Sequence, residues 1–259
     1  MKPKRLAPSF VERIWGSHDL SPLFGQSERK IGEVWFTGDP PLPILVKFLF
    51  TTEKLSVQVH PQGPCGVGKT EMWHILRATG DARIALGFRE PVTRERLREA
   101  ARSGEIEQLL RWTPVRAGET YFAPAGTVHA IGAGITLCEV QQNSDVTYRL
   151  YDYGRPRELH LAQGVEVADL SVHPGVSVPD GRSLVRCEHF VTEWLDVSEI
   201  EYYTPDASRF HLLICLEGSG QLDGVPLTAG DVFLIPAGAE RFAIEPRGRV
   251  RLLRTYVPS

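Results

Sequence analysis

GETYFAPAGTVH, residues 118–129, has a counterpart near the C-terminus, GDVFLIPAGAER at residues 230–241. The two segments align without a gap and share the pattern G-x5-P-x-G. Because the turn glycines and the proline recur at the same offsets, the repeat predicts that one strand–turn–strand unit is used twice. The sequence therefore predicts two similar β-barrels in tandem.

Short runs rich in Val, Ile, Leu, Phe and Tyr fill most of the remaining chain and are separated by glycine and proline. Runs of this length and spacing are typical of all-β sandwiches and barrels. Clear examples are LPILVKFLF (42–50), KLSVQVH (54–60), HLLICLEG (211–218) and RVRLLRTYV (249–257). We therefore predict an all-β fold of two jelly-roll-like barrels, spanning residues 1–168 and 169–259.

One segment, PVTRERLREAARSGEIEQLLRW at 91–112, departs from the strand pattern. Its apolar residues recur at helical spacing, interrupted at Ser103-Gly104. We expect a small insertion of two short helices in the first barrel. Thr93 and Ser103 are the expected N-caps, because a hydroxyl there can accept a backbone N–H.

The overall composition is that of an ordinary soluble globular protein, with 259 residues, 42% hydrophobic and 24% charged. A net charge of −3 gives no reason to expect nucleic acid or an anionic membrane as a partner. No apolar run approaches the ~20 residues of a membrane span, and the N-terminus lacks the apolar core of a signal peptide, so a cytoplasmic location is expected. The four cysteines (65, 138, 187 and 215) form no CxxC pair and are expected to be reduced.

A set of possible metal ligands surrounds the first copy of the repeat. The copy ends at His129, and Gln58-x-His60 and then Glu71 stand upstream of it. This pairing resembles the two motifs of the cupin superfamily, small β-barrels that hold a metal on inward-facing side chains. Residues i and i+2 of a strand face the same way, so Gln58 and His60 should both point into the barrel. We expect Glu71 on the next strand and His129 on the strand after the turn.

The donor set combines an amide oxygen, two imidazoles and a carboxylate. It suits zinc, with manganese, iron, cobalt or nickel as substitutes. In the second copy Arg241 stands in the place of His129, and no Q-x-H or H-x-H precedes it. The second barrel is therefore expected to be structural and free of metal.

Longer segments carry a more specific resemblance. VKFLFTTEKLSVQVHP (46–61), GKTEMWHIL (68–76), PAGTVHAIG (124–132) and EVQQNSDVTYRLYDYGRPRELH (139–160) are similar to type I mannose-6-phosphate isomerases in their short bacterial form. The resemblance covers residues 9–161 strongly and the second barrel weakly. It implies one zinc ion per chain on Gln58, His60, Glu71 and His129. It also implies Lys69, Asp145 and Arg149 at the reacting end of the substrate, and Lys47, Ser56 and Arg149 as phosphate-binding residues.

The implied reaction interconverts mannose 6-phosphate and fructose 6-phosphate by moving a proton between C1 and C2 through a cis-enediol. It needs an electrophile, a base and cations for the phosphate. Lys69 could act as the base if its pKa were lowered, and Asp145 and His60 are rivals. On a regular strand Asp145 and Arg149 would lie ~13 Å apart, so they serve opposite ends of the substrate, or the strand bends.

Three other functions are compatible with parts of the sequence. The barrel could belong to another cupin enzyme, either a metal oxygenase or a different sugar-phosphate isomerase, or to a non-catalytic sugar-phosphate-binding protein. GPCGVGKT (63–70) also matches the G-x-x-x-x-G-K-[ST] loop of nucleotide hydrolases. That loop must run directly into a long helix, whereas Pro61, Pro64 and the short following segment favour a turn between strands. We therefore expect a small sugar phosphate as partner, and neither a nucleotide, nucleic acid nor a membrane.

Overall fold

The first barrel is formed by two antiparallel sheets. The structure, a computed structural model, describes residues 1–64, 66–173, 175 and 177–258. A six-stranded sheet has the order β2 (Pro8–Asp19), β3 (Gln26–Phe36), β4 (Ile44–Phe50), β11 (Ile135–Gln142), β6 (Glu71–Ala78) and β9 (Thr120–Ala123). A five-stranded sheet has the order β12 (Tyr148–Tyr151), β5 (Val57–Val59), β10 (His129–Ile131), β7 (Arg83–Phe88) and β8 (Leu110–Pro114).

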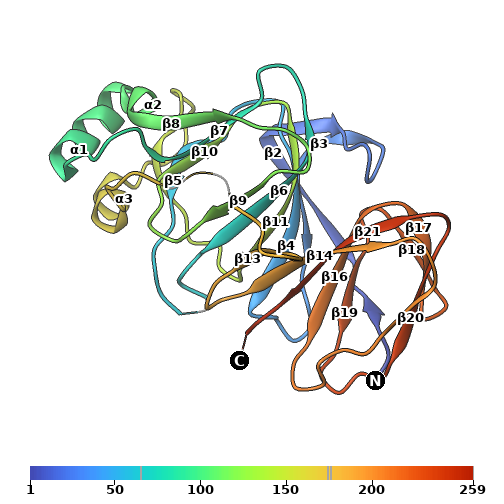
Figure 1. The fold of residues 1–259 in the computed structure, drawn as a ribbon. Coiled ribbons are helices and arrows are strands. Elements are labelled where there is room, and N and C mark those ends of the chain that lie inside the picture. The colour runs from blue at the N-terminus through green and yellow to red at the C-terminus, as the bar shows by residue number, and fades with distance from the viewer. Residues whose placement is uncertain (65, 174, 176, 259) are drawn as a thin grey trace.

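The second barrel lies beside the first and is also built of two sheets (Figure 1). Its six-stranded sheet has the order β1 (Lys4–Arg5), β19 (Val232–Ile235), β16 (His211–Glu217), β21 (Val250–Tyr256), β14 (Val191–Val197) and β13 (Ser183–Arg186). Its four-stranded sheet has the order β15 (Glu201–Tyr203), β20 (Phe242–Pro246), β17 (Ser219–Leu222) and β18 (Val225–Thr228). The all-β prediction is thus confirmed.

The first residues of the chain belong to the second barrel. Lys4 pairs with Leu234 in β19, and the N-terminus lies beside the C-terminal strands in Figure 1. Residues 4–5 therefore cross the predicted boundary, although the boundary at residue 168 itself stays a prediction.

The six-stranded sheets of the two barrels pack against each other through an apolar layer. Strand β4 shows how the sequence allows this, because its residues alternate between the two faces of the sheet. Val46, Phe48 and Phe50 belong to the layer between the barrels, whereas Leu49 belongs to the interior of the first barrel. Since both faces of β4 are covered, all seven of its residues are buried.

Three helices cover the outer face of the five-stranded sheet: α1 (Arg94–Ser103), α2 (Ile106–Leu109) and α3 (Leu161–Val167) (Figure 1). They bury Leu97, Ile106 and Val165 in one cluster with the strand residues Val57 and Val59. Covering this sheet leaves its inner face free to carry polar side chains. No helix in the described part of the chain is long and apolar enough to cross a bilayer.

The helical insertion agrees with prediction at its start and differs at its middle and end. Thr93 caps α1, with its hydroxyl accepting the Arg96 backbone N–H at 3.1 Å. Ser103 is not an N-cap but the last residue of α1, because Gly104 takes a left-handed φ of 87° that ends the helix. The predicted insertion ran to residue 112, but strand β8 already begins at Leu110. Helix α3 was not predicted.

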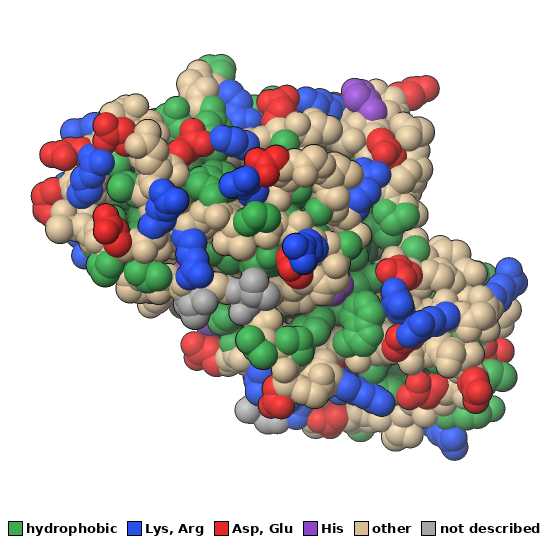
Figure 2. Space-filling view, turned by 45° about the horizontal axis from the view of Figure 1, so that its top comes forward, with side chains coloured by type: hydrophobic (Ala, Val, Ile, Leu, Met, Phe, Trp, Pro, Cys, Tyr) green, Lys and Arg blue, Asp and Glu red, His purple; other side chains and the backbone are tan. Residues whose placement is uncertain are grey.

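The outer surface mixes charges of both signs. Figure 2 shows basic and acidic side chains interspersed over both lobes of the face that it presents. This distribution agrees with the small net charge of −3. Recognition of a charged ligand must therefore depend on local clusters of charged residues and not on the electrostatic field of the whole protein.

Candidate metal centre and substrate cleft

Three predicted ligands meet in the interior of the first barrel. One ligand atom from each of His60, Glu71 and His129 lies within 4.8 Å of the other two, and all three residues are buried. His129 on β10 is the cross-strand partner of Gln58 on β5, whereas Glu71 opens β6 in the facing sheet. The fourth predicted ligand, Gln58, places its amide nitrogen 3.3 Å from His129 Nε2.

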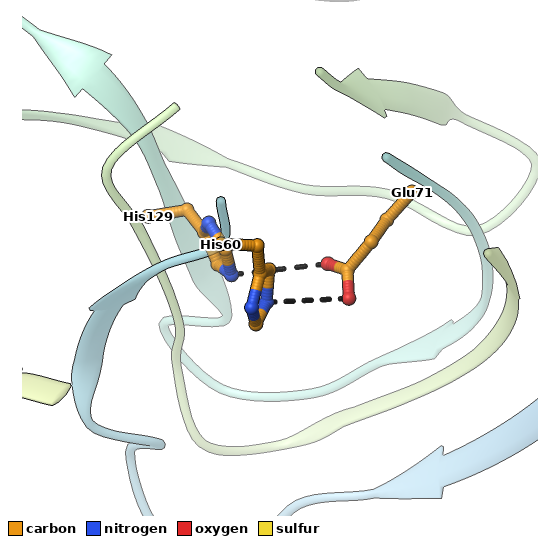
Figure 3. Close-up of side chains that lie close together, drawn as sticks. All are labelled: His60, Glu71 and His129. Atoms are coloured by element: carbon orange, nitrogen blue, oxygen red, sulfur yellow. Dashed lines mark ion pairs between the residues drawn. The ribbon is translucent and has the colours of Figure 1, made fainter. Parts of the chain in front are cut away.

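Both imidazoles turn the same nitrogen toward the carboxylate (Figure 3). His60 Nε2 lies 3.4 Å and His129 Nε2 3.8 Å from Glu71 oxygens. On the opposite side of each ring, Nδ1 lies 2.9 Å from a backbone carbonyl, that of Val146 or Thr127. A carbonyl can only accept, so each Nδ1 carries the proton and each Nε2 offers a lone pair to the centre.

Electrostatics favour neutral rings in this arrangement. Burial is the largest cause that lowers the pKa of both histidines, and the Lys69 ammonium lowers them further. Neutral imidazole is the form that binds metals. Tautomer, ring orientation and protonation state thus all suit a metal site.

Lys69 lies at the edge of the same centre. Its Nζ is 2.8 Å from Glu71 Oε1 and 3.3 Å from His60 Nε2. Burial by itself would lower the pKa of Lys69, but the carboxylates of Glu71 and Glu139 outweigh it and raise that pKa. The lowered pKa that a lysine base requires is therefore not found in this arrangement.

A cleft of about 570 Å³ opens beside the centre. Six of the predicted site residues line it: Lys47, Ser56, Gln58, Lys69, Asp145 and Arg149. A larger cavity of about 960 Å³ is lined by none of the predicted site residues, so size alone does not identify the site. Arg157 and Trp35 also line the cleft and were missed. Arg157 stands in the quoted stretch 139–160, but nothing in the spacing indicated where its side chain lies.

The segment from Gln141 to Arg149 is not one strand. Strand β11 ends at Gln142 and β12 begins at Tyr148, so Asp145 and Arg149 do not lie on one regular strand. The interruption has a use, because the carbonyl of Val146 within it orients His60. Both Asp145 and Arg149 still reach the cleft.

Lys47 has its anionic partners inside the protein. Its side chain is 4% exposed, and Nζ lies 3.2 Å from Glu139 and 3.8 Å from Glu33. It also lies 4.6 Å from the centre of the Trp35 ring. Glu33 also pairs with Arg13 at 2.5 Å, so these two carboxylates balance the charges of Lys47 and Arg13, and Lys47 brings no excess positive charge to the cleft.

Glu139 connects Lys47 to the metal centre. Its other oxygen accepts the indole N–H of Trp73 at 3.0 Å, and the Trp73 ring lies 5.2 Å from that of His129. Glu139 is the cross-strand partner of both Lys47 and Trp73, so the register of β4, β11 and β6 sets this row.

Arg149 differs from Lys47 in the groups that surround its charge. In the part of the chain that the structure describes, no carboxylate lies within 4.0 Å of its guanidinium, and its buried Nε has no hydrogen-bond partner. One terminal nitrogen donates to the Glu158 carbonyl at 2.8 Å. Burial and the neighbouring Arg157 lower the pKa of Arg149 by more than the carboxylates of Asp152 and Glu158 raise it.

The GPCGVGKT segment forms a turn that leads into a strand. Cys65 lies outside the described residues, but the amides of Val67 and Gly68 donate to the Pro64 carbonyl at 3.0 and 2.9 Å. Strand β6 follows at Glu71, where a phosphate-binding loop would need a helix. A Cβ on Gly68 would lie 2.2 Å from the Gly63 carbonyl oxygen, so the glycines serve a tight turn.

In the second repeat copy, the Arg241 guanidinium lies over the Tyr202 ring at 4.4 Å.

The fold and the site define a two-barrel cupin with a candidate metal centre in its first barrel. No family model matches the chain. It is 34% identical to the mannose-6-phosphate isomerase ManA of Bacillus subtilis, an alignment that covers 91% of this chain and 78% of the relative. The chain belongs to the mannose-6-phosphate isomerase family.

Solved structures give the same fold. A mannose 6-phosphate isomerase from Bacillus subtilis superposes with a TM-score of 0.85 at 30% identity, covering 98% of this chain and 99% of that one. A zinc-bound mannose 6-phosphate isomerase superposes with a TM-score of 0.76 at 17% identity, covering 100% of both chains. The second similarity shows the fold alone.

Proposed function

We propose that this protein interconverts mannose 6-phosphate and fructose 6-phosphate, using one zinc ion per chain. The observation that carries the proposal is the buried His60–Glu71–His129 trio, with both Nε2 atoms turned toward the carboxylate, beside a cleft that Arg149 lines. The names of the relatives supply the substrate, and the zinc-bound relative supports the choice of metal.

The residues present fit a zinc ion. His60, His129 and Glu71 supply two nitrogens and one carboxylate, and Gln58 can supply an amide oxygen. The amide oxygen of Gln58 now accepts the Ser56 hydroxyl at 3.2 Å. An amide flip would exchange its oxygen and nitrogen, and a hydroxyl can serve either of them. When bound, the ion supplies a Lewis acid that polarises sugar oxygens.

The cleft residues would handle the protons. Lys69 Nζ, held by Glu71, is proposed to donate hydrogen bonds to the oxygens on C1 and C2. Asp145 is the best candidate for the base that moves the proton between these carbons, because its carboxylate is exposed to the cleft. Arg149 lies one strand from Gln58, as its cross-strand partner, and is proposed to stabilise negative charge on the substrate.

The test combines metal analysis with a coupled assay of fructose 6-phosphate formation. The purified protein should contain close to one equivalent of zinc and should convert mannose 6-phosphate. A chelator should abolish turnover, and added zinc should restore it. Unphosphorylated mannose serves as the control substrate and should be converted far more slowly. A zinc-loaded protein that binds mannose 6-phosphate without converting it would refute the proposal.

A further inference from the structure

Thr70 ends the GPCGVGKT segment and joins three segments of the first barrel. It stands between Lys69 and Glu71 in the chain and is 5% exposed. Its backbone N–H donates to Gln142 Oε1 at 2.9 Å, and its carbonyl accepts the Gln142 N–H at 3.0 Å. Its hydroxyl oxygen accepts the Ala125 N–H at 3.2 Å. Thr70 is thus bound to the end of β11 on one side and to the turn between β9 and β10 on the other.

A proline explains why a side chain supplies the bond to that turn. Strands β6 and β9 pair as far as Glu71 and Ala123. The residue after Ala123 is Pro124, which has no N–H to donate. The next N–H belongs to Ala125, and the Thr70 hydroxyl accepts it. The hydroxyl therefore extends the pairing of the two segments beyond the end of β9.

The turn that the Thr70 hydroxyl holds also determines the orientation of His129. Thr127 in this turn supplies the carbonyl to which His129 Nδ1 donates at 2.9 Å. The Gly126 N–H in the same turn donates to the His60 carbonyl at 2.8 Å. A displacement of the turn would therefore disturb two of the predicted metal ligands at once.

Gln142 holds Thr70 from the opposite side and also binds the start of the GPCGVGKT segment. It is 4% exposed, and its Nε2 donates to the Gly63 carbonyl at 3.3 Å. The orientation of this amide is determined by its partners, because Oε1 faces an N–H donor and Nε2 faces a carbonyl acceptor. One buried glutamine thus fixes both ends of the segment, and the Thr70 hydroxyl connects the segment to the turn at Ala125.

We propose that Thr70 is a positioning residue for the metal centre, and that Gln142 holds Thr70 in place. The inference rests on the proposed function, because it requires a zinc ion on the predicted ligands. The Thr70 hydroxyl fixes the turn that orients His129, and the Thr70 backbone fixes the start of the strand that carries Glu71. Loss of a group that orients a metal ligand typically costs about 10–100-fold in metal affinity. Thr70 acts on His129 through the turn, so we expect the lower end of this range.

The test compares Thr70→Val with Thr51→Val, a matched control in the same barrel. Thr51 is also 5% exposed, and its hydroxyl oxygen accepts the Ile135 N–H at 3.0 Å. It lines the larger cavity, which none of the predicted site residues line. Both variants should lose thermal stability in the metal-free form, because each leaves a backbone N–H without its acceptor. Only Thr70→Val should bind zinc at least about tenfold more weakly in competition with a chelator.

Cobalt-substituted protein gives a second readout, because the absorption of Co²⁺ depends on the geometry of its ligands. The spectrum should change in Thr70→Val and stay the same in Thr51→Val. Thr70→Ser keeps the hydroxyl and should restore both the spectrum and the zinc affinity. Gln142→Met removes the acceptor of the Thr70 N–H and should weaken zinc binding as Thr70→Val does. It therefore decides the question if Thr70→Val fails to fold.

Unchanged zinc affinity and an unchanged cobalt spectrum in Thr70→Val or, where that variant does not fold, in Gln142→Met would overturn the inference. An equal loss of zinc affinity in Thr51→Val would also overturn it, since the effect would then follow from lost stability alone. A wild type that bound no zinc would refute the proposed function and the inference with it. A wild type that bound zinc but did not convert mannose 6-phosphate would refute the isomerase activity only, and the affinity comparison would still decide the role of Thr70.

Discussion

Replacing Lys47 with methionine separates two roles for this residue, because a buried ion pair and a phosphate ligand respond differently. Lys47→Met would leave Glu139 without its only ion-pair partner in the described part of the chain, and would remove one of the two partners of Glu33. Breaking a buried pair from one side typically costs about 3–5 kcal/mol, since the remaining charge is desolvated and unpaired. Lys47 and Glu139 are both nearly inaccessible, with side chains 4% and 5% exposed, so the full range applies.

The expected loss is large enough to measure by thermal unfolding. A change of 1 kcal/mol shifts Tm by roughly 2–4 °C in a chain of this size, so Lys47→Met should unfold about 6–20 °C below wild type. Both proteins are compared saturated with zinc, because ligand binding also raises Tm. Urea titration at 25 °C gives the free energy of unfolding independently.

The double variant Lys47→Met/Glu139→Gln tests the cause. The glutamine is neutral and its oxygen can still accept the Trp73 indole N–H, while Glu33 keeps its 2.5 Å pair with Arg13. The double variant should therefore recover most of the lost stability, which a double-mutant cycle expresses as a coupling energy. A loss below about 1 kcal/mol in Lys47→Met, or no recovery in the double variant, would refute the reasoning. A loss of inorganic phosphate binding in Lys47→Met without a loss of stability would instead support the phosphate role that the family resemblance implies for Lys47.

Three further predictions concern the metal centre, the cleft and the interface between the barrels. Glu71→Ala removes the anionic ligand, so zinc measured after gel filtration and isomerase activity should both fall to background; full activity in the zinc-free variant would contradict the site. Arg149→Ala should lower kcat/KM at least about a hundredfold while zinc content stays at the wild-type level, and expulsion of zinc would contradict the placement of β12. Burial lowers the pKa of His74 from 6.5 to about 4, so the unfolded chain takes up this proton first as the pH falls. Stability from neutral His74 is thus present above pH 6.5 and lost by pH 4, about 3 kcal/mol in total. Urea titrations at pH 6.5 and pH 4 should show that the free energy of unfolding falls by about 3 kcal/mol more in wild type than in His74→Gln. An equal fall in the two proteins would exclude the effect.

Local patterns in the sequence predicted the features that depend on local geometry. The repeated G-x5-P-x-G unit predicted the two barrels. The i, i+2 spacing predicted that the Gln58 and His60 side chains point to the same side, and both lie at the candidate metal centre. Thr93 was a correct cap because its neighbours alone determine the helix start. Ser103 was misread because a serine before a glycine fits either end of a helix, and the left-handed Gly104 made it a C-terminus.

The features that were missed depend on register between strands distant in the sequence. The pairing of Lys47 with Glu139 requires β4 and β11 to align at that residue, which no spacing along the chain reveals. Likewise, Arg157 reaches the cleft only because the chain reverses at Tyr153–Gly154 and Asp152 captures it. The family resemblance implied a phosphate as the partner of Lys47, and the sequence alone did not show that Glu33 and Glu139 lie beside it.

The two faces of the six-stranded sheet of the first barrel explain why a second barrel accompanies the site. The inner face carries the row of Trp73, Glu139 and Lys47, whose positions depend on register. The intervening residues Met72, Cys138 and Val140 point the opposite way, into the layer packed against the second barrel. Close-packed interiors resist small displacements, because any shift opens voids or overlaps atoms. The second barrel thus stabilises the position of the sheet that carries Glu71 and Lys47.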